Sequence, residues 1–479
     1  MPSAKFSSDG IRGIAGEWPI DSSGMWQIGL AIREYLLNPL RNVNKKKAKV
    51  YLGRDTRSSG RELSNALVAG LSCNEIEVVN LGVITTPGVA YLTRKHKADL
   101  GVIITASHNP PQYNGVKLLD SAGFRLKAED ETEIENLIAN MDVGQRQRQI
   151  VTQTSTPENM YDLIKEYAAD QVRLSGLRGR PIPRLLIDCA NGAPARVFPE
   201  VFQSFGSTTQ LVNIEQDGTQ IGGDSGSEYV RHKPDRFAQL IGDTDSDYGL
   251  AFDGDGDRLL IMDRSGQVYD GIDILFVLVK YFHLNPKAKK ALLVDEERST
   301  DDIVTSDSTN RGLDLSLLKY GIATIRPEKH GDRNLEYVMK KKNLLFGAES
   351  VGNIIVNDAR HGSADSLFAS LLLIGIIAET AQENALSYLV SDYIKFPQSL
   401  VSDRPRQTPC LETLPGLEEM KQRYLALIGD DSRQKIWYSS TEPGRLTVMF
   451  EGSISSDPDV VNEAAQKVYS FIESSARPG

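Results

Sequence analysis

Short apolar runs that end in glycine-rich polar loops recur along this chain and constrain its fold more than any other feature. Val50-Tyr51-Leu52 leads into the loop Gly53–Gly60, and a helical pattern follows over residues 61–72. The same order of apolar run and polar loop recurs at Leu100–Ile104, Leu185–Asp188 and Tyr248–Phe252. Buried strands that alternate with helices are typical of α/β units with partly parallel sheets. We therefore predict an α/β fold whose functional groups lie on loops at strand ends.

Length and charge narrow the class of protein. The 479 residues correspond to about three domains at roughly 150 residues each. The net charge of −10 argues against a nucleic-acid partner, which normally requires a basic surface. Apolar runs such as Leu371–Ala378 are shorter than the roughly 20 residues that span a bilayer. With three scattered cysteines and no signal-peptide pattern, we expect a cytoplasmic protein without a membrane partner.

Three polar stretches are candidate boundaries between domains. Residues 142–156 have the composition of a linker, and a second break lies near residues 263–266, which could equally form a hairpin. A third break follows the helix-like stretch 366–382, and the proline-containing stretch 397–409 begins the last segment.

The motif Asp253-Gly254-Asp255-Gly256-Asp257-Arg258 predicts a metal site. Three carboxylates at alternate positions can supply the oxygen ligands that Mg²⁺ prefers, and glycine lets the backbone turn tightly enough for them to converge. An EF-hand is excluded because Arg258 and Arg264 stand where that loop needs Gly and Glu. The alternative that remains is a solvated acidic turn.

A second motif, Thr105–Pro110, follows a buried-strand pattern and contains Ser107 and His108. A serine at the end of such a strand is well placed as a nucleophile or phosphate carrier, although Ser and Asn are also ordinary turn residues. Further along, Asn114–Lys117 offers a turn and then a lysine. Lys117 could return to the site, or it could be a surface lysine on a hairpin.

Basic loops and a hydroxyl-rich loop add candidate anion-binding groups. Arg12 in Asp9–Gly13, and Arg54 and Arg57 in the loop after residue 52, could each hold an anionic oxygen or form an ordinary charged turn. Ser439–Arg445 could form a phosphate cradle or a hydroxyl-capped turn. Together with the metal motif and the serine loop, these features indicate phosphoryl transfer on an anionic substrate.

The serine loop with Asn114–Lys117, and the metal motif Asp253–Arg258, resemble the two signatures of the α-D-phosphohexomutases. The loops Asp9–Gly13 and Ser440–Pro443 occur in the order of that family, so the resemblance covers nearly the whole chain. Within the family, several internal phrases are most similar to the branch that acts on glucosamine phosphates. These phrases include Asp188–Ala193, Gly331-Asp332-Arg333 and Val448–Gly452.

The resemblance implies three related α/β domains and a smaller α+β C-terminal domain around a central cleft. The implied ranges are 1–155 with the serine loop, 156–263 with the metal loop, 264–385 with the sugar-reading loop and 386–479 with the phosphate-binding loop. It also implies a monomeric or homodimeric isomerase, an intramolecular phosphotransferase that moves a phosphoryl group between C6 and C1 of a hexose phosphate.

The family pattern assigns roles to individual residues. Ser107 would carry the phosphoryl group, with a sugar bisphosphate as intermediate and activator, and Mg²⁺ would bind Asp253, Asp255, Asp257 and a phosphoserine oxygen. Lys117 and Arg12 would assist proton transfer or stabilise charge, Arg258 would fix the metal loop, and His108 would orient the serine loop. The implied substrate contacts are Glu349, Ser350, Arg333, Ser439, Ser440, Thr441 and Arg445.

Departures from the family pattern concern the sugar. The usual Gly-Glu-x-Ser-Gly-His loop reads Gly347–Asn353 here, so that either Ala348 replaces the Glu or Val351 replaces the Ser, and Asn353 replaces the His. Trp437 stands where the family has an Arg. We therefore expect a mutase of the glucosamine-phosphate branch first. The alternatives are a glucose- and mannose-phosphate mutase, a sugar-phosphate-binding homologue without mutase activity, and a phosphatase.

Overall fold

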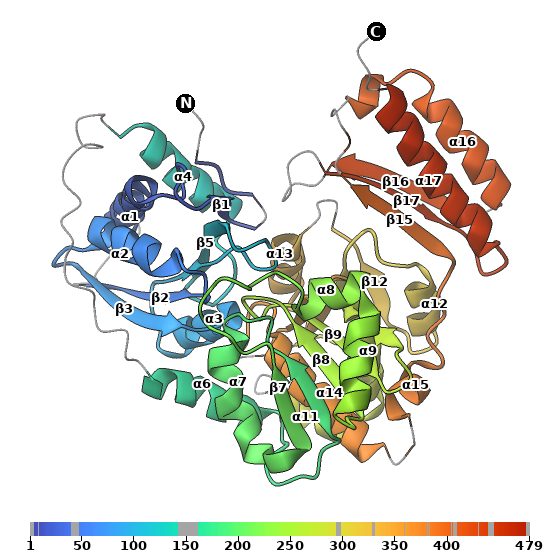
Figure 1. The fold of residues 1–479 in the computed structure, drawn as a ribbon, viewed down its shortest axis with the longest axis horizontal. Coiled ribbons are helices and arrows are strands. Elements are labelled where there is room, and N and C mark those ends of the chain that lie inside the picture. The colour runs from blue at the N-terminus through green and yellow to red at the C-terminus, as the bar shows by residue number, and fades with distance from the viewer. Residues whose placement is uncertain are drawn as a thin grey trace. The chain divides into compact units, whose positions relative to one another are not determined.

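The computed structural model (Figure 1) forms two compact units, each described here by itself. The first comprises residues 1–306 and 324–391, and the second comprises residues 307–323 and 392–479. The structure describes residues 4–7, 9–39, 47–141, 161–293, 298–327, 331–358, 360–380, 382, 384–403, 405, 410–429, 431–438 and 445–475. The predicted linker 142–156 lies outside the described residues.

The first sheet has the strand order β1-β5-β4-β2-β3. Its strands are β1 (Ile11–Ile14), β2 (Ala48–Arg54), β3 (Ile76–Val83), β4 (Leu100–Ile104) and β5 (Tyr113–Asp120). Strands β3, β2 and β4 are parallel, whereas β5 and β1 are antiparallel to their neighbours. Because Arg54 pairs with Ile104 at the carboxyl ends of β2 and β4, the loops that follow these two strands emerge side by side.

Helices cover both faces of this sheet. They are α1 (Ser22–Leu37), α2 (Gly60–Leu71), α3 (Thr86–Lys95) and α4 (Ala128–Ala139). Helices α1 and α2 pack closely because glycines stand at their contact: a Cβ on Gly29 would lie 2.2 Å from the Leu67 carbonyl oxygen. The apolar side chains of α1, α2, α4 and the sheet form one continuous core.

The second sheet repeats this arrangement, with the strand order β10-β9-β8-β6-β7. Its strands are β6 (Leu185–Asp188), β7 (Thr209–Val212), β8 (Tyr248–Phe252), β9 (Leu259–Asp263) and β10 (Val268–Tyr269). The accompanying helices are α6 (Tyr161–Leu174), α7 (Pro194–Phe202), α8 (Gly226–His232), α9 (Pro234–Asp243) and the short 3₁₀ helix η1 (Gln203–Thr208). Residues 263–266 form the turn between β9 and β10, so the hairpin interpretation of this stretch is confirmed.

The third sheet has the order β12-β11-β13-β14. Its elements are α10 (Gly271–Leu284), α11 (Pro286–Leu292), β11 (Asp302–Thr305), β12 (Ala323–Ile325), α13 (Asp332–Lys342), β13 (Phe346–Ala348), β14 (Ile354–Val356), α14 (Ser366–Glu379) and α15 (Ala385–Val390). Helix α14 is apolar on nearly all sides, as expected for a helix buried in a core. Among the described helices, none combines the length and apolarity needed to cross a membrane.

The second unit contains an antiparallel sheet of order β15-β17-β16. Its elements are α12 (Gly312–Leu318), β15 (Gln398–Asp403), η2 (Leu411–Thr413), α16 (Leu417–Ile428), β16 (Arg433–Tyr438), β17 (Leu446–Glu451) and α17 (Pro458–Ser475). Helices α16 and α17 lie side by side against the sheet (Figure 1). The predicted α/β fold is confirmed, whereas the three boundaries between the four predicted domains remain a prediction.

The α1–α2 contact provides a test of the packing. Replacing Gly29 by alanine places a methyl group against the backbone of α2, and we expect the free energy of unfolding to fall by about 1–3 kcal/mol. Gly242 in α9 is the matched control, because a Cβ there meets nothing within 4 Å. Gly242→Ala should therefore be neutral or slightly stabilising. Urea unfolding of both variants checks this, and equal stability of the two would contradict the close packing.

Candidate active site

Ser107 lies at the turn that follows β4, in a loop over residues 105–113 that we call the serine loop. Its backbone has a φ of +53°, which is costly for a residue with a side chain and persists only where the surroundings impose it. The N–H of Ser107 donates to Thr105 Oγ1 at 2.9 Å, and that hydroxyl donates to Asp55 Oδ2 at 2.6 Å. The side chain is buried and 1% exposed, so the turn is held from within the protein.

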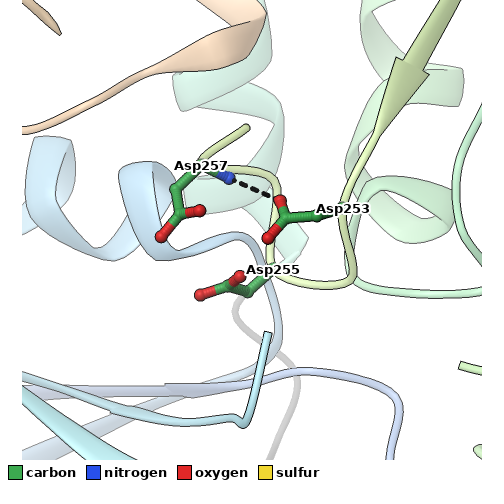
Figure 2. A group of neighbouring side chains, drawn as sticks. All are labelled: Asp253, Asp255 and Asp257. Atoms are coloured by element: carbon green, nitrogen blue, oxygen red, sulfur yellow. Dashed lines mark hydrogen bonds between the residues drawn. The ribbon is translucent and has the colours of Figure 1, made fainter. Parts of the chain in front are cut away.

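The metal loop, Asp253–Arg258, follows β8 and lies against the serine loop. Asp253 Oδ1 accepts from the N–H groups of Asp257 and Arg258 at 3.0 and 3.1 Å, which curls the loop (Figure 2). Asp253 Oδ2 accepts from Ser107 Oγ at 2.6 Å. A Cβ on Gly254 would lie 2.7 Å from the Ser107 carbonyl oxygen, so only glycine permits this approach of the two backbones.

Lys117 lies on β5 with its ammonium group between two carboxylates of the metal loop. Its Nζ is 2.6 Å from Asp255 Oδ2 and 2.9 Å from Asp257 Oδ2, and the residue is 2% exposed. Burial lowers the pKa of Lys117, but the charges of the two carboxylates outweigh burial and raise it. The lysine is therefore charged. Of the two interpretations left open by the sequence, the surface lysine is wrong, because β5 is an interior strand next to the serine loop.

The three aspartates of the metal loop are buried and converge on one point. Each offers a ligand oxygen within 4.8 Å of the others, and Figure 2 shows their side chains turned toward one another. Asp255 Oδ1 and Asp257 Oδ1 are buried and accept no hydrogen bond in the part of the chain that the structure describes. Buried carboxylate oxygens without donors are costly, and a hard cation such as Mg²⁺ would satisfy them. The residues present therefore fit the metal.

The charges around the triad shift the pKa values of its members in opposite directions. Burial, followed by the charges of Asp257 and Asp255, raises the pKa of Asp253. Burial also favours the neutral form of Asp255, but Lys117 and the hydroxyl of Thr86 outweigh it and lower its pKa. Thr86 Oγ1 donates to Asp255 Oδ2 at 2.6 Å. It was not among the residues predicted from the sequence, although its position just after β3, at the start of α3, is the kind of strand-end signal that could have found it.

Three further predicted residues lie in or beside the serine and metal loops. His108 Nδ1 lies 3.2 Å from Ser107 Oγ, and burial together with the charge of Arg258 lowers the pKa of His108, which keeps the imidazole neutral. Arg12 donates to Asn109 Oδ1 at 3.3 Å and lies 3.5 Å from Asp9. Arg258 Nη1 lies 3.9 Å from Glu228 Oε2. The structure thus brings Arg12, His108 and Lys117 to the serine loop.

The loop over residues 347–353, which the family resemblance predicts to contact the sugar and which we call the sugar-reading loop, lies against the metal loop. Leu259 N–H donates to the Gly352 carbonyl at 3.0 Å, and Asn353 Nδ2 donates to the Asp257 carbonyl at 3.3 Å. Burial, followed by the charge of Asp332, raises the pKa of Glu349 to about 8. The charge of Arg258 in the metal loop opposes this shift, and that of Asp9 adds to it.

The other predicted substrate contacts have different surroundings. The Ser350 carbonyl accepts from Arg231 Nη2 at 2.9 Å. Arg333 donates to the Ser7 carbonyl at 2.7 Å and pairs with Glu131 at 2.6 Å. Ser439, Ser440 and Thr441 lie outside the described residues. Arg445 directly precedes β17 in the second unit.

Arg57 requires a correction. The sequence suggested that it could hold an anionic oxygen, but its side chain is buried and 1% exposed. Its guanidinium group donates to Asp55 and to four backbone carbonyls of the serine loop. These bonds occupy its donors, so Arg57 holds the protein's own backbone and has none left for a ligand.

Comparison with known proteins agrees with this geometry. The phosphoglucomutase/phosphomannomutase α/β/α domains I, II and III match residues 3–144, 162–266 and 270–396. The phosphoglucosamine mutase of Staphylococcus aureus (strain JH9) is 32% identical over 459 residues, which cover 95% of each chain. The same identity and coverage hold for that of strain N315.

Solved structures share the fold at lower identity. A phosphoglucomutase/phosphomannomutase family protein from Burkholderia thailandensis superposes with a TM-score of 0.74 at 20% identity, over 100% of this chain and 99% of its own. An N-acetylphosphoglucosamine mutase from Aspergillus fumigatus, solved with GlcNAc-6P and magnesium, gives 0.65 at 14% identity, over 99% and 96%.

Fold and site together define an enzyme that transfers phosphoryl groups, with a serine and a buried carboxylate triad on adjoining loops. The chain belongs to the phosphoglucomutase/phosphomannomutase family of α-D-phosphohexomutases. Members of this family are isomerases that act as intramolecular phosphotransferases and depend on a metal ion, and the buried triad is compatible with that requirement.

The raised pKa of Glu349 predicts how stability depends on pH. The pKa of Glu349 rises from 4.5 to about 8 on folding, so between these values the folded state holds a proton that the unfolded state has released. The free energy of unfolding therefore falls as pH rises from about 4.5 to about 8. Glu349→Gln removes the titration, so the variant should gain stability relative to wild type between pH 5 and pH 8.5 in urea unfolding. Ser350→Ala, which removes no titrating group, should keep the wild-type trend. A Gln variant that follows the wild-type curve would refute the assignment.

Proposed function

We propose that this chain is a phosphoglucosamine mutase, which interconverts the 6-phosphate and the 1-phosphate of glucosamine. The observation that carries the proposal is the position of Ser107 Oγ, 2.6 Å from Asp253 in a buried triad of carboxylates. The choice of glucosamine is supported by the 32% identity to the S. aureus enzymes along 95% of the chain. The proposed reaction uses a phosphoserine and a bisphosphorylated sugar.

Each half of the proposed reaction transfers one phosphoryl group. In the first, the bond from phosphorus to Ser107 Oγ breaks as a bond to the free sugar hydroxyl oxygen forms, and the hydroxyl proton ends on Ser107 Oγ. The resulting bisphosphorylated sugar reorients. In the second, the bond from phosphorus to the other sugar oxygen breaks, Ser107 Oγ takes up that phosphoryl group, and its proton passes to the sugar oxygen. Protons and phosphoryl groups therefore balance over the cycle.

The residues around Ser107 supply what each transfer needs. Asp253 accepts the hydroxyl proton of Ser107 in a hydrogen bond and so orients Oγ. Lys117, charged and buried, can stabilise the negative charge of the transferring group, and Arg12 adds a second cation beside the serine loop. The neutral His108 lies against Ser107 Oγ and can orient it without adding charge. Arg258 fixes the metal loop through its N–H bond to Asp253.

Asp253, Asp255 and Asp257 would hold a Mg²⁺ ion, with an oxygen of phosphorylated Ser107 as a further ligand. When bound, such an ion neutralises the charge that develops on a transferring phosphoryl group. Glu349, Ser350 and Arg333 are proposed substrate contacts, and the family pattern adds Ser439, Ser440, Thr441 and Arg445 as proposed contacts of a phosphate. A sugar bisphosphate is the proposed activator.

The altered sugar-reading loop favours a second candidate within the family. Asn353 stands where the family has a histidine, and its side chain donates to the backbone of the metal loop. The loop that is proposed to select the sugar therefore departs from the family pattern. Phosphoglucomutase/phosphomannomutase activity is therefore the second candidate. A sugar-phosphate-binding homologue without mutase activity is less consistent with a serine and an acidic triad kept in contact.

Loss of the carrier hydroxyl tests the function. We expect Ser107→Ala to lower turnover by about three orders of magnitude or more, because the variant lacks the hydroxyl that carries the phosphoryl group in the proposed reaction. The assay offers the 6-phosphates of glucosamine, glucose, mannose and N-acetylglucosamine with Mg²⁺ and a trace of the matching bisphosphate. Ser175→Ala, at the end of α6, is the control and should remain active.

The outcomes of this assay separate the alternatives. Preferred conversion of glucosamine 6-phosphate supports the proposal, and preferred conversion of glucose or mannose phosphates supports the second candidate. Release of free phosphate without isomerisation would show a phosphatase. No isomerisation of any substrate by the wild type, with Ser107 unphosphorylated in the intact mass spectrum, would sink the mutase proposal.

Metal removal gives an independent prediction. We expect EDTA to abolish turnover and Mg²⁺ to restore it, because the buried carboxylates then regain their counter-charge. Asp257→Asn should raise the Mg²⁺ concentration for half-maximal activity by about tenfold or more. Asp263→Asn, at the end of β9 and outside the triad, is the control. Full activity in EDTA would contradict a metal site at the triad.

A further inference from the structure

Arg57 directs its whole guanidinium group at the backbone of the serine loop. Nη2 donates to the carbonyl oxygens of Ser107 at 2.9 Å and Asn109 at 2.6 Å. Nη1 donates to those of Pro110 at 2.6 Å and Tyr113 at 2.9 Å. The remaining donor, Nε, binds Asp55 Oδ2 at 3.0 Å. All five N–H groups that an arginine offers are thus used.

Asp55 connects the same clamp to the other side of Ser107. Its Oδ2 also accepts from Thr105 Oγ1 at 2.6 Å, and Thr105 Oγ1 accepts the N–H of Ser107 at 2.9 Å. Its Oδ1 accepts the N–H of Arg57 at 3.0 Å. The peptide groups on both sides of the Ser107 Cα are therefore held by one buried ion pair.

Close backbone contacts hold the serine loop from another direction. A Cβ on Gly222 would lie 2.4 Å from the Asn109 carbonyl oxygen of the serine loop, and one on Gly218 would lie 2.5 Å from the carbonyl oxygen of Thr56, the residue before Arg57. Both glycines have positive φ values. With Gly254 against the Ser107 carbonyl, these contacts limit the space around the loop, and the bonds from Arg57 fix its carbonyl groups within that space.

We propose that Arg57 is a positioning residue for phosphoryl transfer, which holds Ser107 in its left-handed turn with Oγ directed at the metal loop. It acts through the serine loop and does not contact the substrate. The left-handed conformation of Ser107 is costly by itself, and the four carbonyl bonds with their charged donor offset that cost. This role rests on the proposed function.

Lysine at this position tests the clamp. Arg57→Lys keeps the charge beside Asp55 but offers three donors from a single point, which cannot reach four carbonyls in the geometry of a planar fork. We expect kcat and the single-turnover rate of Ser107 phosphorylation by glucosamine 1,6-bisphosphate to fall about 100-fold. KM should stay within about threefold, because the substrate contacts remain. Arg61→Lys, an exposed arginine on α2, is the matched control and should behave as wild type.

A structural readout separates positioning from a general loss of stability. Hydrogen exchange of the backbone amides at residues 105–113 should accelerate in Arg57→Lys, while that of amides in β8 and α1 stays unchanged. A variant that only unfolds more easily would lose activity in proportion to its folded fraction and keep wild-type kcat per folded molecule. That result, or wild-type exchange in the serine loop, would overturn the proposal.

A second pair of variants applies if Arg57→Lys does not fold. Thr105→Val removes the hydroxyl that connects Asp55 to the Ser107 N–H, and Thr105→Ser retains it. We expect the valine variant to lose kcat with little change in KM, and the serine variant to recover it. Equal kcat in both would overturn the clamp. If the wild type isomerises no hexose phosphate, the proposed function fails, whereas the exchange experiment still decides the role of Arg57.

Discussion

Three carboxylates are packed within 4.8 Å of one another in the interior of the protein, and the rest of the site depends on how their charge is balanced. An isolated buried carboxylate is costly, and three that repel one another cost more. Lys117 from β5, Thr86 from the start of α3 and Ser107 each supply a donor, and backbone N–H groups of the metal loop satisfy Asp253. Among the described residues, two carboxylate oxygens still have no donor, and a divalent cation would satisfy them.

This charge balance explains why two sheets of the same topology share one site. The serine loop follows β4 in the first sheet, and the metal loop follows β8 at the corresponding position in the second. Side chains on either sheet alone would leave the triad without Lys117 or Ser107 without Asp253. The approach requires backbone contact, so glycine stands at position 254. Ser366 at the start of α14 adds a bond to the Gly256 carbonyl at 2.5 Å, so the third sheet's layer also supports the metal loop.

The loop over residues 347–353 also lies against the metal loop. Asn353 bonds to the carbonyl of Asp257, and Gly352 bonds to Leu259 directly after the metal loop, so the two loops are in direct contact. Of the two residues that the alignments left open, Ala348 is buried within β13, whereas Glu349 directly after it is half-buried, and its contact with the sugar stays a proposal. Arg333, by contrast, is held by Ser7 and Glu131.

The α/β class, the acidic triad and Ser107 could be predicted from the sequence because their signals are local. A buried strand that ends in a tight loop of acidic or hydroxyl residues is visible within about ten residues of chain. The partners of those groups were decided only by tertiary structure. In the sequence, Arg57 and Lys117 are both cations near glycine-containing turns. In the structure, Arg57 binds backbone carbonyls, whereas Lys117 pairs with the triad. The partners of these two side chains depend on strand order and on contacts between residues that are 50 to 140 positions apart in the sequence. No local pattern carries that information, because it arises only when the loops of β2, β4, β5 and β8 are brought together.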